Sequence, residues 1–199
     1  MKKQLIISVG REYGSGGHLV ADKLAEKYGL PLYDRNLLKE VAASRNLDSK
    51  DMEEFDEIQR NKLMSRTVRG FNNSPAHNVA MLQFEYLKRM ADEGKSFVVV
   101  GRCAETVLRD CDALISIFVL GDFDDKIARL MEHHGITEHA AKIMRTKEER
   151  KRKTYHNSNC EGKWGDSRNY DISINASKLG IDETARVLAN YIDARIAEK

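Results

Sequence analysis

The chain has 199 residues, which is enough for one compact α/β domain and too few for two domains of full size. Lys and Arg together number 33 and Asp and Glu 31, so the formal net charge is +2, which argues against a dedicated nucleic-acid binder. Hydrophobic residues at 41% can form a core, and the longest apolar runs, such as residues 113–120, are far shorter than the roughly 20 residues of a membrane span.

The three cysteines, Cys103, Cys111 and Cys160, are an odd number with no paired spacing and no accompanying histidine pattern. This usage is typical of reduced thiols in a reducing compartment. We therefore expect a cytoplasmic protein without a metal site of its own.

Apolar patterning predicts strands and helices that alternate along the chain. In chain order we expect a strand over residues 4–9, a helix that stops at Gly29, a strand over 30–33, and helices over 36–45 and 49–64. A loop over 67–75, a helix over 76–93, a buried strand over 97–100, a helix over 104–109 and a strand over 114–120 follow. The remaining elements are helices over 124–133 and 138–155, a strand over 170–175 and a helix over 182–197.

Five strands that alternate with helices predict an α/β fold with a doubly wound, mostly parallel sheet and helices on both faces. In such sheets ligands bind at the carboxyl ends of the strands. Two of the predicted strands are followed by glycine, at Gly10 and Gly101, so the loops at these points are the first candidates for a binding site.

The segment between the first strand and the first helix, residues 10–17, is called the glycine-rich loop below. Its sequence is GREYGSGG, followed by His18. Glycines let backbone N–H groups converge on an anion, and a helix N-terminus adds partial positive charge, so this loop is expected to bind phosphate. The alternative is a plain turn whose glycines serve close packing. The candidate phosphate-binding residues are Gly10, Arg11, Gly14, Ser15, Gly16, Gly17 and His18.

The loop departs from the Walker A pattern G-x-x-x-x-G-K-[ST]. Gly17 stands where the lysine belongs, His18 stands where the Ser or Thr belongs, and the spacing from Gly10 to Gly16 is one residue too long. Arg11 is the only fixed cation inside the loop, so we hypothesise that it neutralises the phosphates in place of the lysine. The alternative is that Arg11 is a solvated surface residue.

An ordered series of motifs resembles the cytidylate kinase-like family over nearly the whole chain. The motifs are the segment 9–21, Leu32-Tyr33-Asp34-Arg35, Val98-Val99-Val100-Gly101-Arg102, Arg145…Glu149…Arg152, Trp164-Gly165-Asp166 and Tyr170-Asp171. Members of this family are P-loop proteins with the nucleoside monophosphate kinase fold. The resemblance implies a three-layer P-loop kinase fold in a single domain over residues 1–199, with an acceptor-binding insert at about 36–75 and a helical lid at about 137–168. The loop variant of this family likewise lacks the usual lysine.

The resemblance also implies catalytic arginines in the lid. Cytidylate kinases carry R-x-x-x-D-x-x-R there, and this chain keeps both arginines as Arg145 and Arg152, with Glu149 in place of the aspartate. Residues seven apart share a helix face, so both guanidinium groups could stabilise the charge of a transferring phosphoryl group. The alternative is a solvated basic helix.

For the acceptor, the resemblance implies that Arg102 contacts the acceptor phosphate. Cys103 replaces the family's aspartate that meets cytosine, and a thiol is a poor acceptor for an exocyclic amine. Asp34 and Arg35 stand where the family begins its monophosphate-binding segment, although Asp34 could equally cap the next helix. Trp164 is expected to be a packing anchor and Asp171 to be structural.

These patterns together predict ATP-dependent phosphoryl transfer to a small acceptor, with a nucleoside monophosphate such as CMP or dCMP as the first choice. Mg²⁺ would arrive with ATP, held mostly by phosphates and water, with help from Ser15. A kinase for another small metabolite and a nucleotide-binding regulator without turnover are the alternatives. The expected partners are small nucleotides only, without nucleic acid or membrane, and the protein is expected to be a monomer or a homodimer.

Overall fold

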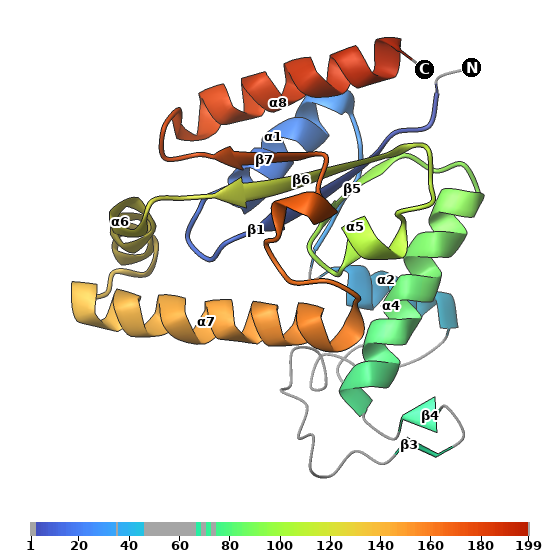
Figure 1. The fold of residues 1–199 in the computed structure, drawn as a ribbon, viewed down its shortest axis with the longest axis horizontal. Coiled ribbons are helices and arrows are strands. Elements are labelled where there is room, and N and C mark those ends of the chain that lie inside the picture. Colours follow the sequence, from blue (N-terminus) through green and yellow to red (C-terminus); the bar gives the residue numbers. More distant parts are fainter. Residues whose placement is uncertain (1–2, 35, 46–66, 69–70, 73–74, 199) are drawn as a thin grey trace.

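A five-stranded, wholly parallel sheet forms the centre of the computed structural model, which describes residues 3–34, 36–45, 67–68, 71–72 and 75–198 (Figure 1). The strand order is β2-β5-β1-β6-β7. The strands are β1 (Ile6–Arg11), β2 (Leu32–Tyr33), β5 (Phe97–Val100), β6 (Leu114–Leu120) and β7 (Ile172–Asn175). All five strands predicted from the sequence are therefore confirmed, and β1 runs two residues further than expected.

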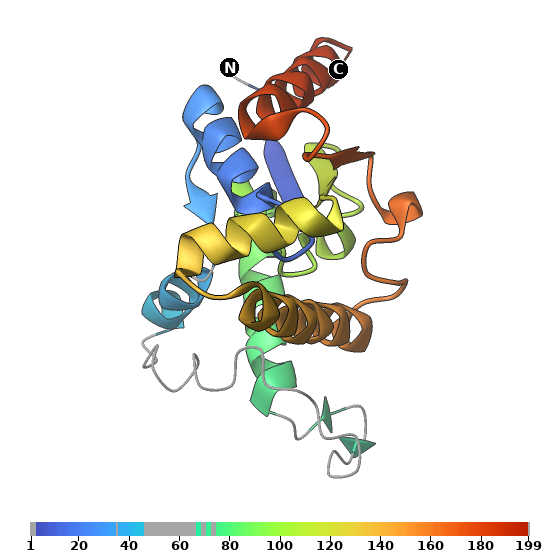
Figure 2. The same cartoon turned by 90° about the vertical axis from the view of Figure 1, so that its left-hand side faces the viewer.

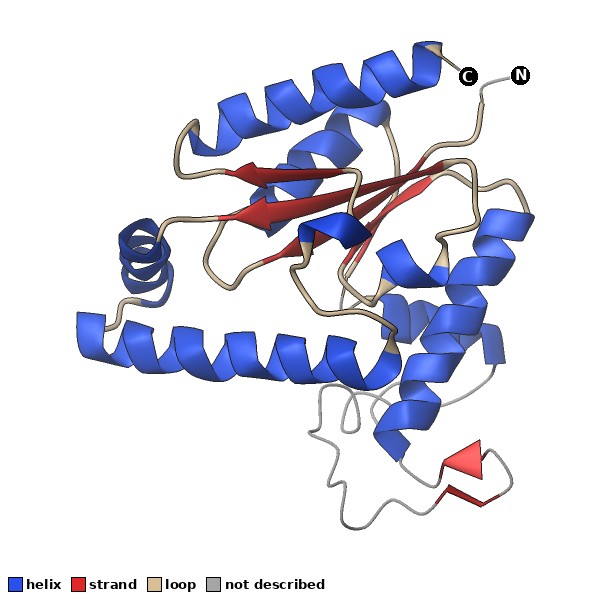
Figure 3. Ribbon diagram, in the orientation of Figure 1, coloured by secondary structure: helices blue, strands red, loops and turns tan. Residues whose placement is uncertain are grey.

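Helices cover both faces of the sheet, which gives three layers (Figure 3). One face carries α1 (Gly17–Tyr28) and α8 (Gly180–Ala197), and the other carries α2 (Leu37–Arg45), α4 (Pro75–Asp92) and α5 (Ala104–Val107). Successive side chains of a strand pack on opposite faces of the sheet. Ile7 of β1 packs against α1 and α8, and Ile6 packs against α2 and α4. The terminal helix α8 thus packs within its own chain.

Two further helices stand at the carboxyl edge of the sheet. α6 (Phe123–His134) follows β6, and α7 (Glu138–Asn159) follows α6 and packs against it through Ile127, Leu130 and Ala141. Figure 2 shows α6 lying across the carboxyl side of the sheet. The predicted lid helix is confirmed as a helix and extends four residues further than expected, to Asn159.

One predicted segment differs from the structure, and a second lies outside the described residues. The loop predicted over residues 67–75 contains a short antiparallel pair, β3 (Thr67–Val68) and β4 (Phe71–Asn72). Strands of two residues are too short to show an alternating pattern, which is why the sequence did not indicate them. The helix predicted over residues 49–64 lies outside the described residues. Within the described part of the chain, no helix is both long and apolar enough to cross a membrane.

The segment after α7 is fixed by aromatic packing and by one carboxylate. Phe118 packs edge-on against Trp164, with ring centroids 5.4 Å apart, and against Tyr170 at 4.9 Å. Asp171 accepts hydrogen bonds from the Ser116 amide at 2.7 Å and from its hydroxyl at 2.9 Å. The roles expected for Trp164 and Asp171, a packing anchor and a structural carboxylate, agree with these contacts.

The order of the strands creates a crevice between β1 and β5. From β1 the chain crosses to β2 and returns through β5 on one side, and then crosses to β6 on the other side of β1. Parallel sheets bind ligands where the direction of winding reverses, outside the carboxyl ends of the strands. The glycine-rich loop and the Gly101 turn therefore meet at this edge.

A buried ion pair fixes the glycine-rich loop to α6. Lys126 Nζ lies 2.7 Å from Glu12 Oε2, with 4% of the lysine side chain and 18% of the glutamate side chain exposed. The same carboxylate oxygen accepts the Gly121 amide at 3.1 Å. Removing one partner of a buried pair leaves the other charge uncompensated, which is far more costly than losing an exposed pair.

We expect Lys126→Met to destabilise the protein by about 3 kcal/mol, the lower end for a broken buried pair, because Glu12 is partly solvated. The double variant Glu12→Gln/Lys126→Met should recover part of this loss, because no charge then remains unpaired. Equilibrium urea unfolding measures both changes.

The matched control is Lys142→Met, which removes an exposed pair with Glu138 and should leave the unfolding curve nearly unchanged. Equal effects of Lys126→Met and Lys142→Met would contradict the assignment of Glu12 and Lys126 as the anchor of the loop.

Candidate active site

A cavity of about 470 Å³ opens at the crevice between β1 and β5. Five parts of the chain line it, namely the glycine-rich loop with the start of α1, Asp34 after β2, the turn after β5, helix α6 and helix α7. The lining residues that matter below are Arg11, Gly14, Gly16, Gly17, His18, Asp34, Arg102, Cys103, Glu105, Arg129, Arg152 and His156. Most of the residues selected from the sequence are thus brought together in one place.

The glycine-rich loop contributes backbone to this cavity. Gly14 and Gly16 have φ angles of 84° and 83°, in the left-handed region that favours glycine. A Cβ at Gly14 would come within 3.0 Å of the Lys126 carbonyl oxygen, and one at Gly16 would overlap Ile181. Gly16 is also the N-cap of α1, without a side-chain cap, so the positive end of the helix faces the cavity.

Two candidates from the loop do not line the cavity. Ser15 is buried, and its hydroxyl donates to the Glu12 carbonyl at 3.0 Å and accepts the Gly17 amide at 3.3 Å. Gly10 belongs to β1, where a Cβ would press against Phe118 at 2.8 Å. Both residues shape the loop from inside, and the sequence could not distinguish this role from contact with a ligand.

Arg11 lies between the two halves of the cavity. Its side chain passes over Gly17, where an added Cβ would lie 2.5 Å from the Arg11 Cβ, and its guanidinium reaches Gly101 so closely that a Cβ there would overlap Nη1. The expected cation therefore points along the crevice, from the glycine-rich loop toward the end of β5. The alternative of a solvated surface arginine does not agree with this position.

The turn after β5 is strained. Gly101, Arg102 and Cys103 have φ angles of 74°, 58° and 55°, so two residues with side chains occupy the left-handed region. This conformation costs energy for residues other than glycine and persists where the surroundings impose it. Here it brings both the Arg102 and the Cys103 side chains into the lining of the cavity.

The two lid arginines occupy different positions. Arg152 lines the cavity, its Nη1 donates to the Arg11 carbonyl at 3.2 Å, and its guanidinium lies 5.0 Å from the centre of the Tyr13 ring. Arg145 is not among the lining residues; it pairs with Glu149 at 2.9 Å and lies over the Phe123 ring. Burial raises the pKa of Glu149 even though Arg145 acts to lower it.

Helix α6 supplies site residues that the sequence did not indicate. Arg129 Nη1 donates to the Gly14 carbonyl at 2.5 Å, and Arg129, His133 and His134 line the cavity. Lys126, Arg129 and His133 recur at i, i+3 and i+7, a spacing that puts them on one helix face and could have suggested a shared partner. The two histidines were expected to be solvated residues, and they are exposed on the rim of the cavity.

Asp34 follows directly after β2. It lines the cavity, its Oδ1 accepts the Asn36 amide at 3.2 Å, and its Oδ2 lies 3.7 Å from His18 Nδ1. Asp34 therefore makes a local hydrogen bond just ahead of α2 and also lines the cavity, a position compatible with both interpretations that the sequence left open. Arg35, the neighbouring candidate, lies outside the described residues, as do Arg60, Arg66 and Arg69 of the expected insert.

Beyond Cys103 the cavity is bounded by a buried cluster that includes Cys160, His156 and Glu105. The hydrogen bond between the two thiols, together with burial, raises the pKa of Cys103, and the same hydrogen bond lowers the pKa of Cys160. Burial alone would lower the pKa of His156, but Glu105, whose Oε1 lies 2.8 Å from Nε2, outweighs it and the pKa is raised. The sequence predicted no such grouping, because 53 positions along the chain separate Cys103 from His156.

The charges around the cavity suit a polyanion. Arg11, Arg102, Arg129, Lys151 and Arg152 line it. Of the lining carboxylates, Glu12 is paired with Lys126 and Glu105 with His156, while Asp34 lies 3.7 Å from His18 Nδ1. Guanidinium groups bind phosphate through paired hydrogen bonds, so the arrangement can hold a polyphosphate and stabilise charge on it.

Comparisons with known proteins identify the family and the fold. The model of the cytidylate kinase-like family matches residues 6–178. An uncharacterized protein from Eubacterium ventriosum has a similar structure, with 42% identity and a TM-score of 0.76 over 96% of this chain and 99% of that chain. No curated protein sequence matches this chain.

Shikimate kinases share the fold at low identity. The enzyme from Bacteroides thetaiotaomicron has 12% identity and a TM-score of 0.54 over 95% of this chain and 98% of that one. The enzyme from Acinetobacter baumannii, solved in complex with shikimate, has 13% identity and a TM-score of 0.52 over 97% and 95%. Because the family match spans every strand of a sheet with the P-loop kinase architecture, the chain belongs to the cytidylate kinase-like family, a membership that supports a phosphotransferase.

Proposed function

We propose that the protein transfers the γ-phosphoryl group of ATP to the phosphate of a nucleoside monophosphate such as CMP or dCMP. The observation that carries this proposal is a single cavity in which the glycine-rich loop faces the Asp34–Arg102 end, with Arg11 and Arg152 between them. Such an arrangement suits a donor polyphosphate at one end and a phosphorylated acceptor at the other.

In this proposal the donor phosphates lie on the backbone of Gly14, Gly16 and Gly17 at the start of α1. Arg11 supplies the charge of the missing lysine, and the closeness of its guanidinium to Gly101 supports a role beside the γ-phosphate. The backbone carbonyl of Gly14 is held by Arg129, so the loop is organised before the ligand binds.

The acceptor would lie between Asp34 and Arg102, with its phosphate on the guanidinium. A phosphate oxygen attacks the γ-phosphorus, the bond to the β-phosphate bridging oxygen breaks, and ADP leaves. The acceptor phosphate is already ionised, so no general base is required and positioning lowers most of the barrier. Arg152, already bonded to the Arg11 carbonyl, would stabilise the equatorial oxygens of the transferring group.

Mg²⁺ suits the oxygen donors at this site. The lining offers the Asp34 and Glu12 carboxylates, and the Ser15 hydroxyl, expected to assist the ion, is instead bonded within the loop. An ion held mainly by phosphates and water, with a carboxylate of the lining as a further ligand, fits this donor set. When bound with ATP, Mg²⁺ would neutralise charge on the phosphates. We place the reaction in the cytoplasm, where the three free cysteines would stay reduced.

One observation favours a second candidate, a kinase for a small metabolite that is not a nucleotide. Cys103 stands where the family resemblance implies an aspartate for cytosine, and it lines the acceptor part of the cavity. A thiol is a weak hydrogen-bond acceptor, so Cys103 would select poorly for the exocyclic amine of cytosine. The acceptor preference must therefore be determined by experiment.

Incubation with ATP, Mg²⁺ and a panel of acceptors tests the proposal, with ADP release as the readout. CMP, dCMP, the other nucleoside monophosphates and shikimate form the panel. We expect release of ADP that depends on a nucleoside monophosphate. Turnover with a non-nucleotide alone would favour the second candidate, and ATP binding without any turnover would indicate a regulator.

Arg152→Ala should lower kcat by about 10²–10³-fold, the cost of removing one donor that stabilises a transition state. Arg145→Ala should lower it less, because Arg145 is engaged by Glu149 outside the cavity. Arg150→Ala, an exposed arginine on the same helix, serves as the control. Equal losses in Arg145→Ala and Arg152→Ala would show that the lid rotates to bring both into the site.

Arg11→Ala should weaken ATP binding by about 10–100-fold, the value of one charge-assisted hydrogen bond of about 1.5–3 kcal/mol. Isothermal titration calorimetry measures the change, with thermal unfolding as a check that β1 is intact. Arg186→Ala on the exposed surface of α8 is the control. Unchanged ATP affinity in Arg11→Ala would remove the assignment of Arg11 as the substitute for the lysine.

A further inference from the structure

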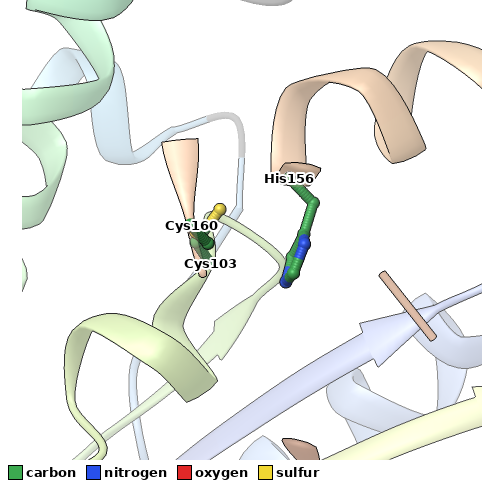
Figure 4. Close-up of side chains that lie close together, drawn as sticks. All are labelled: Cys103, His156 and Cys160. Carbon is green, nitrogen blue, oxygen red and sulfur yellow. The ribbon is translucent and has the colours of Figure 1, made fainter. Parts of the chain in front are cut away.

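Two cysteines and a histidine gather where the end of α7 meets the turn after β5 (Figure 4). One ligating atom from each of Cys103, His156 and Cys160 lies within 4.8 Å of the other two. It is the one group of at least three such side chains found within the described ranges that could hold a metal ion. Its members come from two distant parts of the chain.

The cluster is enclosed rather than spread over the surface. Cys103 is 3% exposed and His156 is 4% exposed, and Cys160 is half-buried. Cys103 and Cys160 belong to a small apolar cluster with Ala80 and Phe84 of α4. Burial of this kind limits the access of water to the three groups.

Helix geometry aligns two of the three groups. His156 and Cys160 are four residues apart, and the Cys160 amide donates to the His156 carbonyl at 2.9 Å, so the last helical turn of α7 is intact between them. Residues at i and i+4 project from the same face. Cys103 meets this face from the turn in which both Arg102 and Cys103 adopt left-handed backbone conformations.

The histidine also has the outer partner that metal-binding histidines commonly use. Glu105 Oε1 lies 2.8 Å from His156 Nε2, and both side chains are at most 5% exposed. A ligating histidine usually donates its other ring N–H to a carboxylate, which fixes the ring and its tautomer. Here Nδ1 is the nitrogen that remains, and its present neighbour is Asn157 Oδ1 at 3.3 Å.

We propose that Cys103, His156 and Cys160 form a binding site for one Zn²⁺ ion, with Glu105 as the positioning residue of the histidine. Two thiolates and one imidazole are the ligands that Zn²⁺ prefers over Mg²⁺, which selects oxygen. Bond lengths of about 2.3 Å to sulfur and 2.0–2.1 Å to nitrogen place tetrahedral ligands about 3.5–3.8 Å apart. The ligand atoms lie within 4.8 Å of one another, so side-chain rotations that move them by about 1 Å bring them to these distances.

The fourth coordination position would face the cavity, since Cys103, Glu105 and His156 also line it. Zinc at this point would connect the end of the lid helix to the turn that carries Arg102. This site is independent of Mg²⁺ and of the identity of the acceptor.

The test uses the full-length protein, stripped of metal by a chelator and kept reduced. Titration with Zn²⁺ against a chromogenic chelator should give one tightly bound ion per chain, and Co²⁺ in its place should show the absorption of thiolate-to-cobalt charge transfer. Cys160→Ser should abolish both, whereas Cys111→Ser, which removes the cysteine outside the cluster, should retain both. Glu105→Gln should weaken Zn²⁺ binding by about 10–100-fold while leaving the charge-transfer band in place.

Circular dichroism of each variant verifies that it is folded, and Cys160→Ser changes only a half-buried residue at the end of a helix. Three results would overturn the proposal. These are Zn²⁺ affinity equal in Cys160→Ser and the unaltered chain, a Co²⁺ complex without the charge-transfer band, or no Zn²⁺ uptake together with a Cys103–Cys160 disulfide on exposure to oxidised glutathione.

Discussion

The attachment of the glycine-rich loop to α6 is the constraint on which the rest of the site depends. Backbone amides bind phosphate well only when they are held in place before the ligand arrives. Gly17 occupies the position of the usual lysine, so the support of the loop comes from other side chains. Lys126 and Arg129 of α6 hold the loop from outside, through Glu12 and the Gly14 carbonyl. These two cations are in addition to Arg11, the cation of the loop itself.

The guanidinium groups of the cavity come from four separate segments. Arg11 belongs to the end of β1, Arg102 to the turn after β5, Arg129 to α6 and Arg152 to α7. They converge because parallel strands β5 and β6 flank β1, so that everything following these strands meets at one edge of the sheet. Among these arginines, Arg152 connects α7 to the glycine-rich loop through its hydrogen bond to the Arg11 carbonyl.

Helix α7 is held at both ends. Its first turns pack on α6 through Ala141, and its last turn is joined to α5 by the buried contact between His156 and Glu105. A movement of the whole helix away from the loop would therefore break contacts at one of these ends. A metal ion on Cys103, His156 and Cys160 would reinforce the C-terminal end, which meets the strained backbone of Arg102 and Cys103.

The sequence by itself determined the five strands, most of the helices and the position of the glycine-rich loop between β1 and α1, because apolar periodicity and glycine spacing are local properties. It also identified Arg11, Arg102 and Arg152, which stand at strand ends or in a motif. Only the tertiary structure placed Arg145 outside the cavity, turned Ser15 into the loop, and added Arg129 and the cluster around Cys103 to the site. These features arise from contacts between residues far apart in the chain, and the direction of a side chain across such a contact is set by packing, which no local pattern records.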